Sequence, residues 1–388
     1  MEKMHYYIKA DRFFLRSGME SAGYLEVKDG HFGRYTKEAP NAGKHEILDY
    51  TGKWVAPGLV DTHIHGFKGH DVMDCDLGGL KEIAQGLLSC GVTSFLPTTL
   101  TADIESLNKV SKLIGEHYQE LDGARVQGIF FEGPFFTEQY KGAQNPNYFM
   151  DPDKKIFDHW QELSGGLIKK IALAPERKGA LQFIEVVVNQ GVHVALAHSA
   201  ATYQQSRAAV GVGASIFVHT FNGMSGFNHR DPGMAGAAMT TEASFTEVIC
   251  DGHHVHPAAV NVLLKSKSPD KVVLITDCMR AGGMPEGEST LGEFSVLVKD
   301  GAARLKEGNS LAGSILELFK GVQNVLDWDL VTVEEAFKMA SLIPARSVGI
   351  DDQCGSIQPE RAADFLIVEP ELSLVATYLG GRKVYSKD

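Results

Sequence analysis

The chain has 388 residues, 44% of them hydrophobic, which is enough to bury one large core. Lysine and arginine number 37 against 49 aspartates and glutamates, so the net charge is −12 at pH 7. This acidic balance argues against a general nucleic-acid or anionic-membrane surface, and an anionic ligand would need locally placed cations. No apolar run approaches about 18 residues and the first residues lack a signal-peptide pattern, so we expect a cytoplasmic protein without membrane contact.

The cysteines are few, odd in number and widely spaced: Cys75, Cys90, Cys250, Cys278 and Cys354. They form no CxxC pair. Neither a disulfide framework nor a cysteine-type zinc site is therefore predicted.

The two ends of the chain have β character. Residues 1–57 mix aromatic and β-branched residues with Asp-Gly and Thr-Gly turns, and residues 355–388 return to the same pattern. We expect both segments to form one small, discontinuous β-sandwich domain. Residues 58–354 would then form a separate, larger domain.

Within that larger domain, apolar strand-like runs alternate with helical patterns. Eight runs are recognised: "GLVDTHIH", "VTSFLPTT", "RVQGIFFEGP", "IKKIALAPE", "GVHVALAHS", "ASIFVHTFN", "FTEVICDGHH" and "KVVLITD". Eight strand–helix repeats in about 220 residues are typical of a (β/α)8 barrel. The nearly continuous apolar strands fit a parallel sheet that is buried on both faces.

Past the eighth run the pattern changes. Residues 284–313 predict a β-hairpin insertion, and residues 314–327 and 332–342 predict two helices. Thr332 is expected to cap the second helix, with Glu335 at the spacing of a capping box.

Nearly every predicted strand ends in polar residues that are capable of chemistry. They are His63 and His65, Thr98 and Thr99, Glu132, Glu176, His198, His219 and Asn222, His253 and His254, and Asp277. Barrel enzymes build their active sites at the carboxyl ends of the strands. The pattern therefore indicates a catalytic barrel.

His63 and His65 are separated by one residue at the end of the first strand. Side chains at i and i+2 of a strand share a face, so both imidazoles should point into the barrel mouth while Ile64 faces the helices. Taken alone, such a pair fits a metal site about as well as a surface pair or a histidine bonded within the core.

Four other strand-end residues strengthen the metal interpretation. Glu132 follows three apolar residues, and carboxylates are seldom buried unless they are paired or metal-bound. His198, His219 and Asp277 end the fifth, sixth and eighth runs. Imidazole and carboxylate ligands without thiolates suit Zn²⁺ or Fe²⁺.

This arrangement resembles the metal-dependent amidohydrolase superfamily. The blocks "APGLVDTHIHG", "FFEGPFF", "VHTFNGMSGFNHRDPGMAGAA" and "LITDCMRAGG" are similar to the N-acetylglucosamine-6-phosphate deacetylase family, over essentially the whole chain. The resemblance implies metal-dependent hydrolysis of N-acetylglucosamine 6-phosphate to glucosamine 6-phosphate and acetate, in amino-sugar metabolism. Glu176 ends the fourth strand where the superfamily often has a carbamylated lysine, so Glu132 is the better bridging candidate.

The resemblance also implies roles for the metal ligands. Glu132, His198 and His219 match the primary ligands. His63 and His65 match the pair that holds a second ion in some members, so one or two ions are expected. Asp277 matches the catalytic aspartate, which also reaches the second ion.

For the substrate, the resemblance implies that His254 engages the acetamide carbonyl and that Asn222 and Gly223 meet the phosphate. Arg230 matches a phosphate-binding arginine that is contributed by the partner subunit of a homodimer. Further expected substrate contacts are Ala143, Gln144, Leu311, Ala312 and Gly313. The chain departs from the family at two of these positions, because many members have histidine in place of Gln144 and alanine in place of Gly223.

Three alternatives stay open at this point. No motif separates N-acetylglucosamine 6-phosphate from its galacto epimer. Another amidohydrolase reaction, such as that of a cyclic amidase or deaminase, is disfavoured by Glu132 and by the segment from Asn222 to Arg230. A non-catalytic phosphosugar-binding regulator is disfavoured by the intact Asp277 and ligand set.

Overall fold

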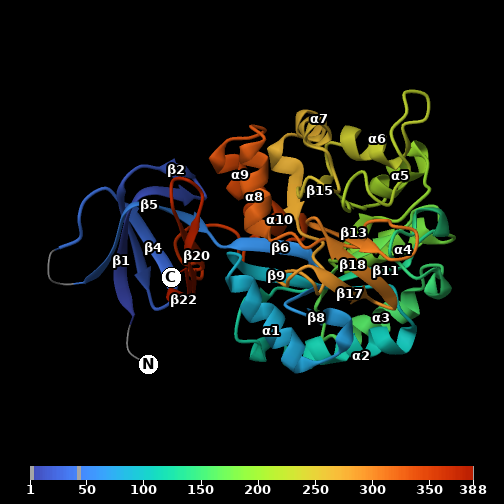
Figure 1. Ribbon diagram of the computed structural model, residues 1–388, viewed down its shortest axis with the longest axis horizontal. Helices are drawn as coiled ribbons and strands as arrows, with labels where there is room; N and C mark the ends of the chain where they lie inside the picture. The colour runs from blue at the N-terminus through green and yellow to red at the C-terminus, as the bar shows by residue number, and fades with distance from the viewer. Residues whose placement is uncertain (1–3, 42–44, 388) are drawn as a thin grey trace.

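A computed structural model describes residues 4–41 and 45–387. A smaller β domain carries both ends of the chain, and a larger barrel lies beside it (Figure 1). None of the described helices is long and apolar enough to cross a membrane.

The β domain is one eight-stranded sheet built from both ends of the chain. In sheet order its strands are β22 (Arg382–Ser386), β21 (Leu374–Leu379), β20 (Phe365–Val368), β5 (Glu46–Pro57), β1 (His5–Leu15), β3 (Gly23–Lys28) and β4 (His31–Thr36), with β2 (Gly18–Glu20) paired to β1. Strand β5 joins the two halves, since it pairs with β1 on one side and β20 on the other.

Alternating burial explains why these segments fold together. Tyr6, Ile8 and Ala10 on β1 are buried, and they share one apolar core with Phe365 and Tyr378 from the other end of the chain. The expected terminal β domain is thus confirmed as part of the fold. Its boundaries at residues 57/58 and 354/355 stay a prediction.

The larger body is the predicted parallel barrel. Its strands are β6 (Leu59–Ile64), β9 (Val92–Thr99), β11 (Ile129–Phe135), β12 (Ile168–Leu173), β13 (His193–Leu196), β14 (Ile216–Phe217), β15 (Phe245–Ile249) and β16 (Val272–Ile275), and β10 (Arg125–Val126) adds to β9. Ile64 and Cys278 form a parallel bridge that brings the first strand beside the last. Each of the eight predicted runs overlaps one of these barrel strands.

Helices surround the barrel (Figure 1). They are α1 (Leu77–Leu88), α2 (Ile104–His117), α3 (Lys154–Leu163), α4 (Ala180–Asn189), α5 (Tyr203–Gly211), α6 (Gly233–Thr240), α7 (Pro257–Lys267), α8 (Leu318–Asp327), α9 (Val333–Met339) and α10 (Leu342–Ser347). The capping box of Thr332 and Glu335 is present at α9. Helix α8 begins later than predicted, because the Ser314 backbone N–H donates to the Asp277 carbonyl.

Two small antiparallel elements lie on the strand-end side. Strands β7 (Gly66–Phe67) and β8 (His70–Asp71) form a short pair, and the predicted hairpin is a three-stranded sheet of β17 (Gly287–Leu291), β18 (Phe294–Lys299) and β19 (Ala302–Leu305). Leu291 and Val296 of that sheet pack in one cluster with Leu100, Ala143 and Ala312. The insertion therefore covers loops at the mouth of the barrel.

Candidate metal centre and active site

The strand-end histidines and carboxylates converge at the barrel mouth. They form two groups, one of His63, His65 and Asp277 and the other of Glu132, His198 and His219. Within each group the candidate ligand atoms all lie within 4.8 Å of one another, and all six residues are buried. The structure thus brings together every residue that the sequence predicted as a metal ligand.

Glu132 connects the two groups. Its Oε1 lies 3.2 Å from Nε2 of His219 and 3.4 Å from Nε2 of His198. Its Oε2 lies 3.1 Å from Nε2 of His65. Asp277 Oδ1 closes the other group at 3.2 Å from His65 Nε2 and 3.3 Å from His63 Nε2. Glu132 therefore occupies the position of a carboxylate that could be shared by two ions.

The contacts of the Nδ1 atoms fix the orientation of the imidazole rings. Three of the four histidines place Nδ1 against a backbone carbonyl: His65 against Thr98 (3.2 Å), His198 against Tyr140 (2.9 Å) and His219 against Asn222 (3.0 Å). A carbonyl only accepts, so Nδ1 carries a hydrogen and Nε2 is the ring nitrogen that faces the centre. This is the outer-shell arrangement that orients metal-binding histidines.

Two further observations fit a metal ion. Nε2 of His63 is buried and forms no well-aligned hydrogen bond among the described residues, although Asp277 Oδ1 lies 3.3 Å away, whereas buried polar atoms normally form one. His198, His219 and Asp277 have positive φ angles of 44°, 30° and 50°. Non-glycine residues with such strained backbones cluster at functional sites. The donor set of imidazoles and carboxylates therefore suits a divalent cation.

Charge–charge contacts shift the pKa values in this centre. Burial would raise the pKa of Asp277, but the positive charges and close contacts of His63 and His65 outweigh it and hold the pKa well below its usual range. Burial would lower the pKa of His65, but its contacts with Asp277 and Glu132 raise that pKa to about 9. The ion-free centre therefore keeps a proton on His65 at neutral pH.

Ion binding should consequently release protons. Because the pKa of His65 is raised in the folded protein, its protonation stabilises the ion-free fold. This stabilisation is full at pH values below the ordinary pKa of 6.5 and is lost as the pH rises through about 9. At pH 7 a cation must displace the proton on His65, so apparent affinity should fall with decreasing pH. Calorimetric titrations in buffers of different ionisation enthalpy would measure the release, and binding without proton release at pH 7 would contradict this reasoning.

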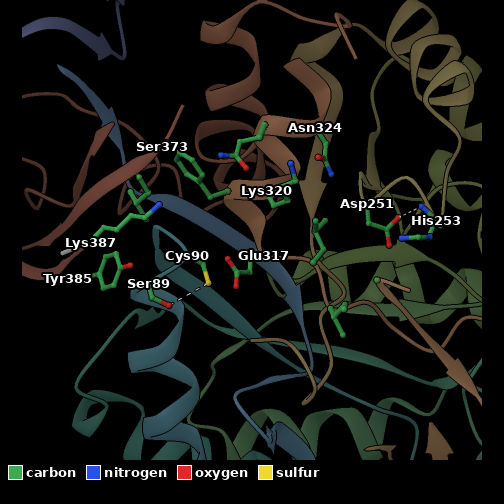
Figure 2. Close-up of a pocket in the computed structure, with 16 residues that line it drawn as sticks. Ser89, Cys90, Asp251, His253, Glu317, Lys320, Asn324, Ser373, Tyr385 and Lys387 are labelled. Carbon is green, nitrogen blue, oxygen red and sulfur yellow. Dashed lines mark hydrogen bonds between the residues drawn. The ribbon is translucent and has the colours of Figure 1, made fainter. Parts of the chain in front are cut away.

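His254 lies after β15 and is held by a residue that the sequence analysis did not single out. Its Nδ1 lies 2.6 Å from Asp251 Oδ2, and Asp251 Oδ1 accepts from the backbone N–H groups of His253 and His254. The "DGHH" spacing was the signal, since an aspartate three residues before a histidine can close such a turn. His253 and Asp251 also line a cavity of about 610 Å³ (Figure 2), and the catalytic role of His254 stays a prediction.

Gln144 makes contacts other than the expected sugar contact. Its side chain is buried; Oε1 accepts from the Thr101 backbone N–H at 3.0 Å, and Nε2 donates to Glu132 Oε2 at 2.8 Å. The Thr101 contact fixes which end of the amide is which. Gln144 therefore orients the carboxylate that lies between the two groups.

Three of the other expected substrate residues, Asn222, Gly223 and Gly313, lie next to candidate ligands. The backbone carbonyl of Asn222 accepts from Nδ1 of His219 and so fixes the orientation of that ring. A Cβ added to Gly223 would lie 2.9 Å from His198 Nδ1, so glycine allows the close packing there. The segment containing Leu311, Ala312 and Gly313 follows strand β19, and a Cβ on Gly313 would lie 3.0 Å from the Asp277 carbonyl oxygen. Ala143 and Ala312 are buried beneath the inserted sheet.

Arg230 is separate from this arrangement. It is exposed in the loop between β14 and α6, which projects from the barrel in Figure 1. Among the described residues, no hydrogen bond or ion pair joins its guanidinium to the histidine centre. Its backbone N–H donates to the Asn228 side chain.

A parallel eight-stranded barrel with histidines and carboxylates gathered at its strand ends is the architecture of a barrel enzyme with a candidate metal centre. Residues 54–384 match the model of the Amidohydrolase family, and the chain belongs to that family.

The similar proteins include two sugar-phosphate deacetylases. The chain is 41% identical to an N-acetylglucosamine-6-phosphate deacetylase of Vibrio furnissii, over 85% of this chain and 82% of that protein. It is 38% identical to an N-acetylgalactosamine-6-phosphate deacetylase of Escherichia coli O157:H7, over 98% of this chain and 99% of that protein.

A solved structure extends the similarity to the whole fold. It is a mutant N-acetyl-D-glucosamine-6-phosphate deacetylase from Mycobacterium smegmatis in complex with N-acetyl-D-glucosamine-6-phosphate. It superimposes with a TM-score of 0.93 at 28% identity, covering 98% of this chain and 100% of that one.

Proposed function

We propose that this chain hydrolyses N-acetylglucosamine 6-phosphate to glucosamine 6-phosphate and acetate, using one or two Zn²⁺ or Fe²⁺ ions. The observation that carries the proposal is Glu132, which lies between two ligand groups with Asp277 in one of them. Relatives of the same family with this activity support the choice of substrate.

A bound divalent ion supplies Lewis acidity, which polarises the amide and makes a water molecule acidic enough to react near neutral pH. Asp277 then acts as the base that takes the proton from the attacking water, and passes it to the departing nitrogen. In the ion-free protein the carboxyl group of Asp277 is ionised, because His63 and His65 hold its pKa below the usual range.

His254 stabilises the negative charge that develops on the amide oxygen. Asp251 accepts from Nδ1–H and thereby orients the ring, so the opposite nitrogen, Nε2, would meet the amide oxygen in the proposed complex. Asp251, just after β15, is fixed by the backbone N–H groups of His253 and His254, and it therefore holds the His254 ring in place before the substrate binds.

The phosphate anchors the sugar at a distance from the reacting bond. Asn222 and Gly223 meet it in the proposed complex, and the partner's Arg230 binds it across a homodimer interface. Guanidinium groups suit bidentate phosphate binding, and the exposed loop position of Arg230 allows it to reach a second subunit.

Mixed dimers test this arrangement. Arg230→Ala subunits combined with Asp277→Asn subunits should regain part of the activity that each parent lacks, because one of the two sites would have both residues intact. Acetate release by purified mixed dimers measures it. No recovery in verified mixed dimers would assign Arg230 to the site of its own chain.

The galacto epimer is the second candidate substrate, because the full-length relative from Escherichia coli is named for it. Acetate release from both 6-phosphates and from unphosphorylated N-acetylglucosamine separates the possibilities. We expect the gluco 6-phosphate to have the highest kcat/KM, with the unphosphorylated sugar lower by at least about tenfold. Higher kcat/KM on the galacto epimer would reverse the assignment, and equal turnover with and without phosphate would remove the role of Arg230.

We also place the enzyme in the cytoplasm. Its five cysteines are unpaired, and four of them are buried. Free thiols are typical of reducing compartments.

A further inference from the structure

A buried ion pair lies against the first metal-binding histidine. Lys170 on β12 and Glu247 on β15 are both 0% exposed, and the Lys170 ammonium donates to Glu247 Oε1. The other carboxylate oxygen of Glu247 lies 3.3 Å from Nδ1 of His63. Three residues from three strands thus form a chain that ends at the metal centre.

This contact distinguishes His63 from the other candidate ligands. His65, His198 and His219 each place Nδ1 against a backbone carbonyl, whose position the fold itself fixes. Among the four histidines, His63 is the one whose described Nδ1 partner is a side-chain carboxylate. An ionised carboxylate only accepts, so Glu247 keeps a hydrogen on Nδ1 and makes Nε2 the ring nitrogen that faces the metal centre, 3.3 Å from Asp277 Oδ1.

Lys170 holds that carboxylate in place. A carboxylate buried without a partner would be strongly disfavoured as an ion and would become a poor acceptor. Lys170 itself is fixed from two sides, because Nζ lies 3.6 Å from the centre of the Phe130 ring and donates to the Thr62 carbonyl at 3.5 Å. Lys170, on the fourth barrel strand β12, therefore lies inside the barrel and not at its mouth.

We propose that Lys170 and Glu247 are positioning residues for His63, and that they set the affinity of the His63, His65 and Asp277 group for its ion. The group of Glu132, His198 and His219 would keep its ion without them. This inference rests on the two-ion form of the proposed function, but it is independent of the substrate.

The test removes both charges together. Lys170→Met with Glu247→Met keeps similar side-chain lengths, and replacing a buried ion pair by apolar residues is often neutral for stability. The double variant should unfold at a temperature close to that of the unaltered protein and should hold one ion per subunit. Affinity for the second ion should fall about 10–100-fold, as is typical when an outer-shell partner is lost.

Metal content and metal titration of chelator-treated protein with Zn²⁺ provide the readout, so no substrate is needed. Lys267→Met is the matched control: Lys267 is another buried lysine, bonded to the Thr241 carbonyl and to Ser244, and its loss should leave both affinities unchanged. If the double variant does not fold, Glu247→Gln alone should still weaken the second ion.

Three results would overturn the inference. One is a folded double variant, or a Glu247→Gln variant, that binds two ions as tightly as the unaltered protein. Another is equal loss of both ions, which would indicate general damage to the centre. A third is an unaltered protein that never holds an ion at His63 and His65, which would also remove the second ion from the proposed function while leaving deacetylation with one ion intact.

Discussion

Asp277→Asn should lower the turnover of N-acetylglucosamine 6-phosphate by about 10²–10⁴-fold, the usual contribution of a general acid–base group. The amide has nearly the same shape as the carboxylate but cannot take a proton from water or pass one to nitrogen. The ion held by Glu132, His198 and His219 should stay, because Asp277 belongs to the other group.

Acetate release and metal content measured on the same preparation separate the two effects. A low rate with one ion per subunit retained is the expected combination. A near-normal rate would remove Asp277 as the acid–base group, and a low rate in protein that has lost all metal would leave its role in proton transfer unsupported.

Glu132→Gln should abolish both metal binding and turnover, since Glu132 contacts histidines of both groups through different oxygens. An amide lacks the negative charge that binds two cations, and its NH₂ end would face His65 or His219. Burial would raise the pKa of Glu132, but His63, His198 and His219 hold it well below its usual range, so the residue is ionised in the ion-free protein.

Glu176→Gln is the matched control for this variant. Glu176 also follows a barrel strand, but its oxygens accept from the hydroxyls of Thr137 and Ser199 and from the Ala200 backbone N–H. We expect it to retain metal and turnover. A Glu132→Gln protein that keeps both ions, or equal metal loss in the two variants, would contradict the shared-carboxylate arrangement.

Much of the barrel could be predicted because each strand and its end leave a recognisable pattern in a short stretch of sequence. A strand buried on both faces reads as an apolar run, and the polar residue at its end marks the mouth. Once eight such runs were ordered in a closed barrel, His63, Glu132, His198 and Asp277 had to converge. The two ends of the chain were similarly recognisable from alternating aromatic and β-branched residues.

Individual side-chain contacts inside the barrel and beneath its loops could not be predicted in this way. Lys170 and Glu247 are charged residues within two different strands. From the sequence alone, each side chain would be expected to face a helix or the solvent. They become partners only because the barrel closes and brings the two strands' inner faces together. Gln144 was expected at the sugar, but its amide is engaged by Thr101 and Glu132, which no spacing reveals. The third strand of the insertion was missed for the same reason, because it depends on pairing with β18.

The central claim is metal-dependent deacetylation at the centre around Glu132. It is tested most directly by acetate release from N-acetylglucosamine 6-phosphate in chelator-treated protein, before and after Zn²⁺ or Fe²⁺ is added back. We predict no release by the ion-free protein and recovery of turnover as one or two ions per subunit return. Full turnover without metal, or none in metal-replete folded protein, would contradict the account.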